Sequence, residues 1–374
     1  MTQCEPGFFD YLAKLSCSTV KVYAAKEGSA VFPRVPLLTI EGPLLVVQLL
    51  ETTVLTLVNY ASLIATNAAR HRLVAGKDKK LLEFGLRRAQ GPDGGISAAR
   101  YSYLGGFDGT SNVAAAKLFD IPCTGTHAHS YVSSYLGFED ITNPIMKPGP
   151  SASPNVKEQN FIELVKEKSA LLKEDREFSA QNHTNSSELA AFTAYAIAFP
   201  NAFLALVDTY NVQHSGIPNF VAVAMALRDM GYHPRGIRLD SGDLGYLSIW
   251  CRNFFKKVDN KYPSEACPLE KMNIVVSNDI HEEVLFSLNE QGHSIDSYGI
   301  GTHLVTCYKQ PALGCVYKLV SIKGHPRIKL SEDVEKVTIP GRKRCFRLFG
   351  KDGHALVDLM IGDDEEPPQV LGLC

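Results

Sequence analysis

The sequence predicts an α/β fold, an irregular TIM-like α/β barrel with a discontinuous β-rich domain built from the N- and C-terminal segments. Three observations predict it. Short apolar runs alternate with helical segments between residues 44 and 314, as they do in βα units. Period-two alternation marks strands in residues 1–43 and again in residues 315–374. The length of 374 residues accommodates a barrel of about 250 residues and a second domain.

The N-terminal segment contains strand candidates at residues 18–23, 31–33 and 37–40, each next to turn-forming residues. A long helical region follows, from about residue 44 to about residue 75. Its most apolar part, residues 43–69, also contains glutamine, glutamate and asparagine side chains. These polar groups predict a buried amphipathic helix rather than a membrane span.

Apolar runs in the central segment end in loops rich in glycine or polar residues. Parallel strands joined by crossover helices explain this alternation. About seven such units indicate a closed or nearly closed barrel, with an open doubly wound sheet as the alternative. The runs are residues 82–86, 101–104, 121–123, 203–207, 236–239, 273–276 and 297–300.

Residues from about 140 to 187 interrupt the alternation and form an expected insertion. Proline, glycine and serine are frequent in residues 144–154, which predicts a mobile loop, and a charged helix is expected over about residues 158–177. Asn185, followed by Glu188, predicts an N-cap with its N3 glutamate at the start of the next helix. Further strand candidates lie at residues 316–320, 327–330 and 344–348.

The composition argues against several classes of function. The formal charge of −2 is not typical of a protein that binds nucleic acid or a membrane surface. The nine cysteines include no Cys-x-x-Cys pair, so we expect a reducing compartment and neither a zinc site nor a disulfide framework. The first residues lack the charged and apolar regions of a secretory signal. These features predict a cytoplasmic protein, and they allow a small anionic substrate.

The most informative motif is the run from Gly236 to Asp243. Arg238 lies inside an apolar strand, and Asp240 and Asp243 follow it closely. A buried arginine is costly unless it is paired, so one interpretation is a core salt bridge. The other is a substrate site, because a guanidinium binds carboxylates or phosphates in bidentate fashion. Aspartates beside it would accept ribose hydroxyls or hold a magnesium ion.

Other predicted strand ends also carry reactive or flexible residues. Gly299, Gly301 and Thr302 suit either a phosphate nest or a simple turn. Ser277 and Asn278 end the preceding strand, and barrel phosphate sites often use the last loops.

The remaining candidates lie earlier in the chain. His127 and His129 stand two residues apart with no third metal ligand evident, so zinc is not expected. Phe84 and Arg87 would suit a flat anionic ring or a phosphate, or they would form an aromatic core residue beside a solvated charged edge.

Together these motifs resemble those of nicotinate phosphoribosyltransferase, a family of type II phosphoribosyltransferases. The resemblance runs from about Phe8 to about Leu359. Agreement over so many loops is not expected by chance. The stretches that carry it are residues 42–51, 65–70, 86–95, 236–244 and 299–302.

The resemblance implies synthesis of nicotinate mononucleotide from nicotinate and 5-phosphoribosyl 1-diphosphate, with coupled hydrolysis of ATP. It implies Mg²⁺ or Mn²⁺ as cofactor and a homodimer with shared active sites. The catalytic residues would be His129, which such enzymes phosphorylate transiently, and Asp240, which would hold ribose hydroxyls. Asp243 would contact the metal ion.

The resemblance also assigns substrate contacts. Thr126 and Arg238 would hold nicotinate, and Phe84 would stack on the pyridine ring. Relatives that use nicotinamide place an aspartate in the loop equivalent to residues 109–112, where Ser111 stands here. A slip of one residue in this register would bring Asp108 close instead. The phosphoribosyl diphosphate contacts would be Arg87, Ser277, Asn278, Gly299, Gly301 and Thr302.

Two departures from the family pattern leave alternative functions open. Family members carry an additional segment before Phe8 that supplies a tyrosine to the partner's pyridine site, and they continue well past residue 360. We therefore expect a chain truncated at both ends. One alternative function is a non-catalytic isoform or fragment that dimerises with or regulates the full-length enzyme. Another is a phosphoribosyltransferase that prefers nicotinamide.

Overall fold

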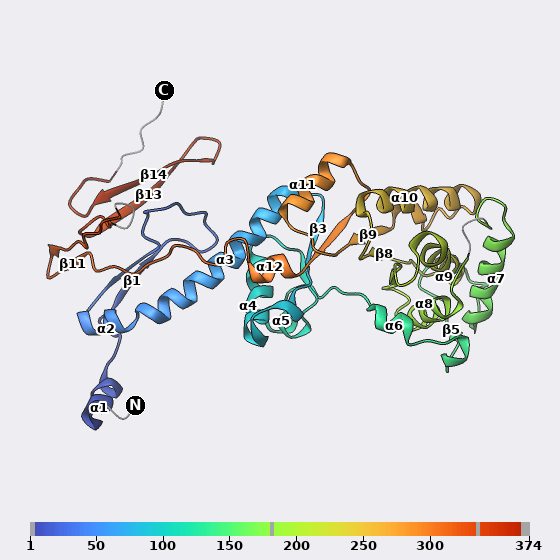
Figure 1. Ribbon diagram of the computed structural model, residues 1–374, viewed down its shortest axis with the longest axis horizontal. Helices are drawn as coiled ribbons and strands as arrows, with labels where there is room; N and C mark the ends of the chain where they lie inside the picture. Colours follow the sequence, from blue (N-terminus) through green and yellow to red (C-terminus); the bar gives the residue numbers. More distant parts are fainter. Residues whose placement is uncertain (1–3, 180–182, 334–336, 368–374) are drawn as a thin grey trace. The chain divides into compact units, whose positions relative to one another are not determined.

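The computed structural model describes residues 4–179, 183–333 and 337–367 (Figure 1). The chain divides into two compact units, Met1–Tyr60 with Ala312–Cys374, and Ala61–Pro311. The division falls inside helix α3, whereas the sequence predicts a domain boundary after residue 43. No helix within the described residues is long and apolar enough to cross a membrane.

The larger unit is built on a parallel sheet with the strand order β4-β3-β10-β9-β8-β7. Most residues of β8, β9 and β10 are buried, as expected for parallel strands covered on both faces. The strands are β3 (Lys80–Glu83), β4 (Gly109–Thr110), β7 (Leu204–Leu206), β8 (Gly236–Leu239), β9 (Asn273–Val276) and β10 (Ser297–Ile300).

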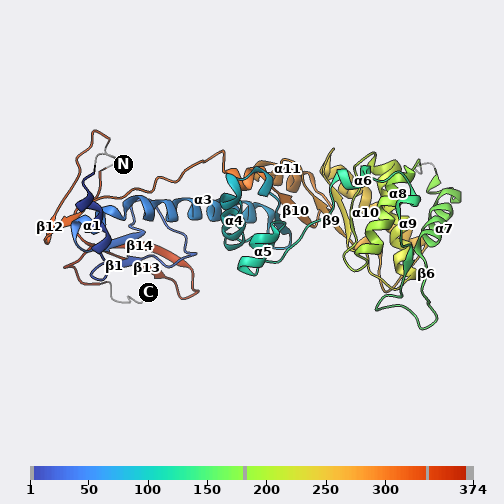
Figure 2. The same ribbon diagram turned by 90° about the horizontal axis from the view of Figure 1, so that it is seen from below.

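Helices surround this sheet, and Figure 2 shows α7 to α10 gathered beside its β7–β9 end. Helix α9 is apolar on all sides and buried along nearly its whole length. Asparagines cap α5, α7 and α8, and Asp243 caps α10. The helices are α3 (Glu51–Ala75), α4 (Gly91–Leu104), α5 (Val113–Phe119), α6 (His129–Ser133), α7 (Phe161–Glu174), α8 (Ser186–Ala198), α9 (Ile217–Asp229), α10 (Leu244–Lys261), α11 (Glu282–Gln291) and α12 (Thr302–Thr306).

The predicted α/β class with a parallel sheet is confirmed, with local corrections. Residues 101–104 are not a strand, because they form the last turn of α4. Residues 121–123 contribute an isolated bridge between Cys123 and Thr110 beside the β4 edge. Within the described residues, no further ladder joins this edge to β7, so the hydrogen-bonded sheet has six strands. The insertion contains β5 (Ile145–Met146) and β6 (Gln159–Asn160) before α7.

The smaller unit contains short antiparallel pairs. Strand β1 (Lys21–Ala24) pairs with β2 (Leu38–Glu41), and β13 (Lys343–Phe349) pairs with β14 (Ala355–Gly362). The Arg342 guanidinium joins the two pairs through Glu41 at 2.7 Å. Of the predicted C-terminal strands only residues 344–348 form a ladder strand, because residues 316–320 and 327–330 are irregular. The remaining elements are α1 (Pro6–Lys14), α2 (Leu44–Leu49), β11 (Ser321–Ile322) and β12 (His325–Pro326).

Candidate active site

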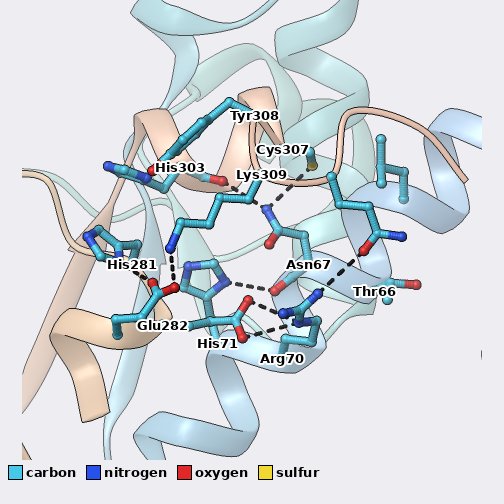
Figure 3. Close-up of a pocket in the computed structure, with 13 residues that line it drawn as sticks. Thr66, Asn67, Arg70, His71, His281, Glu282, His303, Cys307, Tyr308 and Lys309 are labelled. Atoms are coloured by element: carbon cyan, nitrogen blue, oxygen red, sulfur yellow. Dashed lines mark hydrogen bonds and ion pairs between the residues drawn. The ribbon is translucent and has the colours of Figure 1, made fainter. Parts of the chain in front are cut away.

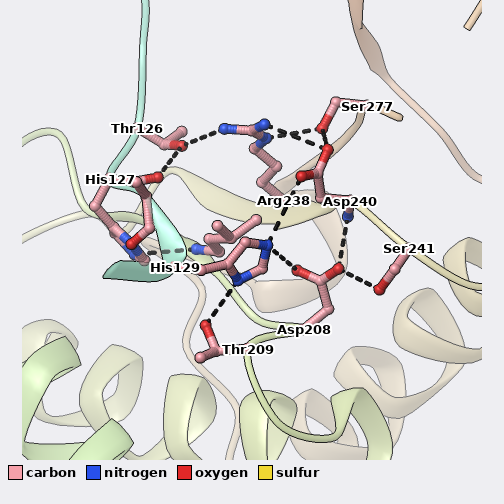
Figure 4. Close-up of polar contacts among 11 residues, drawn as sticks. Thr126, His127, His129, Asp208, Thr209, Arg238, Asp240, Ser241 and Ser277 are labelled. Carbon is pink, nitrogen blue, oxygen red and sulfur yellow. Dashed lines mark hydrogen bonds and ion pairs between the residues drawn. The ribbon is translucent and has the colours of Figure 1, made fainter. Parts of the chain in front are cut away.

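A polar cluster occupies the carboxyl ends of neighbouring strands in the larger unit (Figure 4). Asp208 follows β7, Arg238 and Asp240 lie in and after β8, and Ser277 follows β9. Parallel strands bring these ends to one edge of the sheet, which is where α/β enzymes place their reactive groups. The loop that carries Thr126 and His129 reaches the same place.

Arg238 is the centre of the cluster. Its Nε donates to Ser277 Oγ at 2.8 Å, its Nη1 to Thr126 Oγ1 at 3.1 Å, and its Nη2 to Asp240 Oδ1 at 3.4 Å. A guanidinium has five N–H groups, so these contacts within the described residues leave two for a ligand. The ion pair between Arg238 and Asp240, expected on one interpretation of the sequence motif, exists but is long, and the substrate site of the other interpretation stays a prediction.

An aromatic ring lies against the guanidinium. The Arg238 Cζ atom stands 5.3 Å from the ring centroid of Phe84, which follows β3. A Cβ atom at residue 299 would overlap the ring carbons of Phe84, so the glycine makes room for the ring. At residue 301 a Cβ atom would stand 3.1 Å from the Phe84 carbonyl oxygen. Ring and guanidinium together form a surface suited to a flat anion.

His129 faces two carboxylates. Its Nε2 lies 3.8 Å from Asp208 Oδ1 and 3.7 Å from Asp240 Oδ2, and its Nδ1 lies 3.0 Å from Thr209 Oγ1. The His129 side chain is 44% exposed, so one side of the ring remains open to a reactant. The arrangement places an imidazole between acidic groups with one side accessible, as the prediction of a reactive His129 requires.

Asp208 was not singled out from the sequence, although it directly follows an apolar run. Its side chain is 2% exposed. Oδ2 accepts the Asp240 N–H at 3.1 Å and the Ser241 hydroxyl, while the buried Oδ1 has no hydrogen-bond partner among the described residues. Its position after β7 matches that of Asp240 after β8, and this shared position is the signal that would have found it.

His127 differs from His129 in its surroundings. Its Nε2 accepts the N–H of Leu206 at 3.1 Å, and its ring packs against Tyr131, Phe192 and Tyr195. Burial lowers the pKa of His127 to about 4. The imidazole is therefore neutral and structural, and it ties the loop to the edge strand β7.

Ser111 and Asp108, the two residues expected near the substituent of a pyridine ring, have different hydrogen-bond partners. Ser111 donates its N–H to the Glu83 carbonyl at 3.0 Å and its hydroxyl to the same oxygen at 3.3 Å. Asp108 is engaged elsewhere, because its carboxylate accepts from Arg72 at 2.5 Å and from the Leu81 N–H at 2.7 Å. The alternative in which Asp108 serves the site would require it to leave these partners.

Other predicted residues lie at the edge of the cluster or outside its hydrogen bonds. Asp243 Oδ1 caps α10 by accepting the Tyr246 N–H at 2.9 Å. Asn278 has a left-handed backbone with φ 94°. Thr302 begins α12, and Arg87 is exposed and forms no ion pair with a described residue. Within the described residues no three histidine, cysteine or acidic side chains are placed to hold a metal ion.

A pocket away from this cluster, drawn in Figure 3, lies among α3, α11 and α12. Asn67 Nδ2 donates to the carbonyls of His303 and Leu304, each at 2.9 Å. These two hydrogen bonds fix the position of α12, which begins at Thr302. They give the stretch at residues 65–70 a structural role. His71 is buried here, and burial lowers its pKa.

Comparison with known proteins identifies one family. The family model described as nicotinate phosphoribosyltransferase N-terminal domain matches residues 1–59, and the model of the nicotinate phosphoribosyltransferase family matches residues 79–355. The chain is 59% identical over 372 residues to nicotinate phosphoribosyltransferase 1 of Arabidopsis thaliana, covering 98% of this chain and 65% of the relative. It is 51% identical over 369 residues to the Homo sapiens nicotinate phosphoribosyltransferase, covering 98% and 67%.

Solved structures agree with these sequence matches. The crystal structure of human nicotinic acid phosphoribosyltransferase superposes with a TM-score of 0.81 at 47% identity, covering 98% of this chain and 69% of that one. A nicotinate-nucleotide pyrophosphorylase from Pyrococcus furiosus, at 21% identity and a TM-score of 0.60, shares the fold. The chain spans just under two thirds of the length of its Arabidopsis relatives, 65% and 66%.

Proposed function

The chain belongs to the nicotinate phosphoribosyltransferase family, and on this premise we propose that it forms nicotinate mononucleotide and diphosphate from nicotinate and 5-phosphoribosyl 1-diphosphate. The observation that carries the proposal is the Arg238 guanidinium, with two N–H groups to spare and the Phe84 ring beside it. A pyridine carboxylate presents a flat ring and a planar anion, which this pair of side chains complements.

Nicotinate would bind with its carboxylate on Arg238 and its ring on Phe84. Thr126 and Ser277 already fix the guanidinium through its Nη1 and Nε atoms, so its orientation is set before substrate arrives. The neutral Ser111 hydroxyl does not repel a carboxylate, as an aspartate at that place would. The proposed preference is therefore for the acid over the amide.

The phosphoribosyl group would lie beside Asp240. Breaking the bond between the anomeric carbon and diphosphate leaves cationic character on the ribose, which a carboxylate stabilises while the pyridine nitrogen attacks. We assign the 5-phosphate to the backbone of Gly301 and Thr302, at the start of α12, and further diphosphate contacts to Arg87 and Asn278. Gly299 contributes indirectly, because it makes room for Phe84.

ATP would act through His129. In this step Nε2 attacks the γ-phosphorus of ATP, the bond from that phosphorus to the bridging oxygen breaks, and ADP leaves. Asp208 and Asp240 lie within 3.8 Å of Nε2 and would hold the ring in position. The new phosphoryl group would add negative charge beside the substrate site and would shift the conformation of nearby loops.

Magnesium fits this site as an ion that accompanies the phosphates. Mg²⁺ takes oxygen ligands and usually keeps one or two carboxylates together with substrate phosphates. Asp240 and Asp243 offer carboxylate oxygens at the mouth of the site, with one oxygen of Asp243 already used as the cap of α10. The ion, Mg²⁺ or Mn²⁺, would neutralise the departing diphosphate.

We also propose a cytosolic homodimer with shared sites, as the family resemblance implies. The cysteines within the described residues are all free, which suits a reducing compartment. Sedimentation of the purified chain tests the dimer.

A direct assay tests the reaction. The purified chain should form nicotinate mononucleotide from nicotinate, 5-phosphoribosyl 1-diphosphate, ATP and magnesium, and excess nicotinamide should compete weakly. Absence of product with correctly folded protein would overturn the proposal. Product formation from nicotinamide in preference to nicotinate would overturn the assignment of Arg238 and Ser111.

A further inference from the structure

Glu188 has an unexpected partner set. The sequence predicts that it completes the N-terminal cap of α8, but Asn185 caps that helix alone, accepting the N–H groups of Ser187 and Glu188. The Glu188 carboxyl group turns inward instead and is fully buried, at 0% exposure. Its Oε2 accepts from the Ser215 hydroxyl at 2.5 Å and from Asn219 Nδ2 at 3.0 Å.

Among the described residues, hydrogen-bond donors reach only one of the two oxygens of the Glu188 carboxyl group. Both contacts reach Oε2, while Oε1 is buried and has no hydrogen-bond partner among the residues that the structure describes. In the same part of the chain, Asn219 Oδ1 and Asp208 Oδ1 are also buried acceptors without hydrogen-bond partners. Buried acceptors are normally satisfied, so their occurrence around two carboxyl groups indicates a missing donor. A proton on Glu188 would supply a donor and remove a buried charge.

Glu188 is connected to the active site through the end of β7. Ser215 belongs to a π-helical turn, Val212–Gly216, a type of turn often found at functional sites. Gly216 packs so closely on Val207 that a Cβ atom would overlap the Val207 carbonyl. Val207 immediately precedes Asp208, the carboxylate that faces His129.

Among the described residues, one ionisable neighbour, Asp208, acts on the pKa of Glu188. Ser215 on the π-helical turn and Asn219 on α9 are neutral, and Asp208 at the end of β7 is acidic. Burial and, less strongly, the charge of Asp208 together raise the pKa of Glu188 to about 7, against the hydrogen bonds from Ser215 and Asn219, which lower it. Asp208 accepts a backbone N–H and a hydroxyl on its Oδ2.

We propose that Glu188 is a positioning residue whose buried carboxyl group carries a proton behind Asp208, so that no second buried charge lies behind the Asp208 carboxylate that faces His129. The role of His129 in this statement rests on the proposed function, whereas the protonation of Glu188 does not. Loss of the proton would place a second buried charge behind the site and disturb the geometry around Asp208.

Infrared spectroscopy tests the proton directly. The wild-type protein at about pH 6 should show a carbonyl band of a protonated carboxylic acid, which disappears as the pH rises to about 9. Glu188→Gln should remove this band. Glu83→Gln is the matched control: burial also raises the pKa of Glu83, but both of its oxygens have donors, Gly85 N–H and the Thr110 hydroxyl, so this variant should keep the band. A band unchanged in Glu188→Gln would overturn the proposal.

Thermal unfolding gives a second readout that does not depend on catalysis. A group whose pKa is raised on folding contributes stability below its unfolded pKa, and that stability is lost as pH rises through the folded value. The melting temperature of Glu188→Gln relative to wild type should therefore increase between about pH 5 and pH 8. A constant difference across this range would contradict a titrating Glu188.

Catalysis tests the positioning role. In wild type, kcat/KM for nicotinate should decline on the alkaline side, and Glu188→Gln should move this decline upward by about one pH unit. A purely structural role would lower kcat/KM equally at every pH, and this result would overturn the positioning role. If no variant forms product, the infrared and unfolding results still decide the protonation, and only the proposed function fails.

Discussion

Two histidines separated by one residue show how differently the two sides of one loop are used. On the buried side, His127 accepts a backbone N–H from β7 and packs among aromatic rings. On the open side, His129 faces the carboxylates of Asp208 and Asp240 and remains 44% exposed. The residue type is the same but the surroundings differ: desolvation keeps His127 neutral, whereas His129 faces two carboxylates, which supports the reactive role proposed for it.

Replacement of Arg238 tests the open side most severely. Arg238→Lys keeps the charge but loses the planar fork that holds Thr126, Ser277 and a carboxylate. We expect kcat/KM for nicotinate to fall by roughly 100-fold to 4000-fold, since breaking a buried charged contact costs about 3–5 kcal/mol. Steady-state kinetics measures this. A change below fivefold would remove Arg238 from nicotinate binding.

Replacement of each histidine by alanine should separate the two sides. His127→Ala leaves the Leu206 N–H without an acceptor and opens a cavity among aromatic rings. We expect a loss of about 3 kcal/mol in the free energy of unfolding, measured in urea. His129→Ala should change this free energy by less than about 0.5 kcal/mol while abolishing ATP coupling. The opposite pattern would reverse the two assignments.

Acidification tests the buried side alone. The folded pKa of His127, about 4, lies below the ordinary value of 6.5, so the folded state binds fewer protons than the unfolded state between these values. Its contribution to stability is present above pH 6.5 and is lost as pH falls through about 4, a change of up to about 3 kcal/mol. Urea unfolding of His127→Gln against wild type measures it. If the unfolding free energies of His127→Gln and wild type changed equally with pH, this result would contradict a neutral His127.

A smaller effect is expected at Asp208. Asp208→Asn removes the charge that faces His129 Nε2 at 3.8 Å, and we expect labelling of His129 by radioactive ATP to fall roughly tenfold. Ser241→Ala is the control, because it removes one hydrogen bond to Asp208 and leaves the charge. Equal losses in both variants would show that hydrogen bonding, rather than charge, positions the ring.

Much of the fold and part of the site could be predicted from sequence. The βα alternation predicted a parallel sheet, and the polar residues after apolar runs predicted where its carboxyl ends would meet. The strand predicted at residues 101–104 was wrong, because aromatic and apolar residues occur in a helix as well as in a strand. Asp208 was overlooked because an aspartate after a strand has no local pattern that distinguishes it from a turn residue.

The sequence by itself determined the α/β class, the family resemblance and the identity of the candidate residues, because apolar periodicity and motif spacing are local properties of the chain. Only the tertiary structure decided which residues meet. Arg238 acquires Thr126 across 112 positions, and His129 acquires Thr209 across 80. The tertiary structure also decided which carboxyl groups are solvated and which are buried. Charge state follows from those surroundings, so the neutral form of His127 and the protonated form proposed for Glu188 emerge only when distant segments pack together.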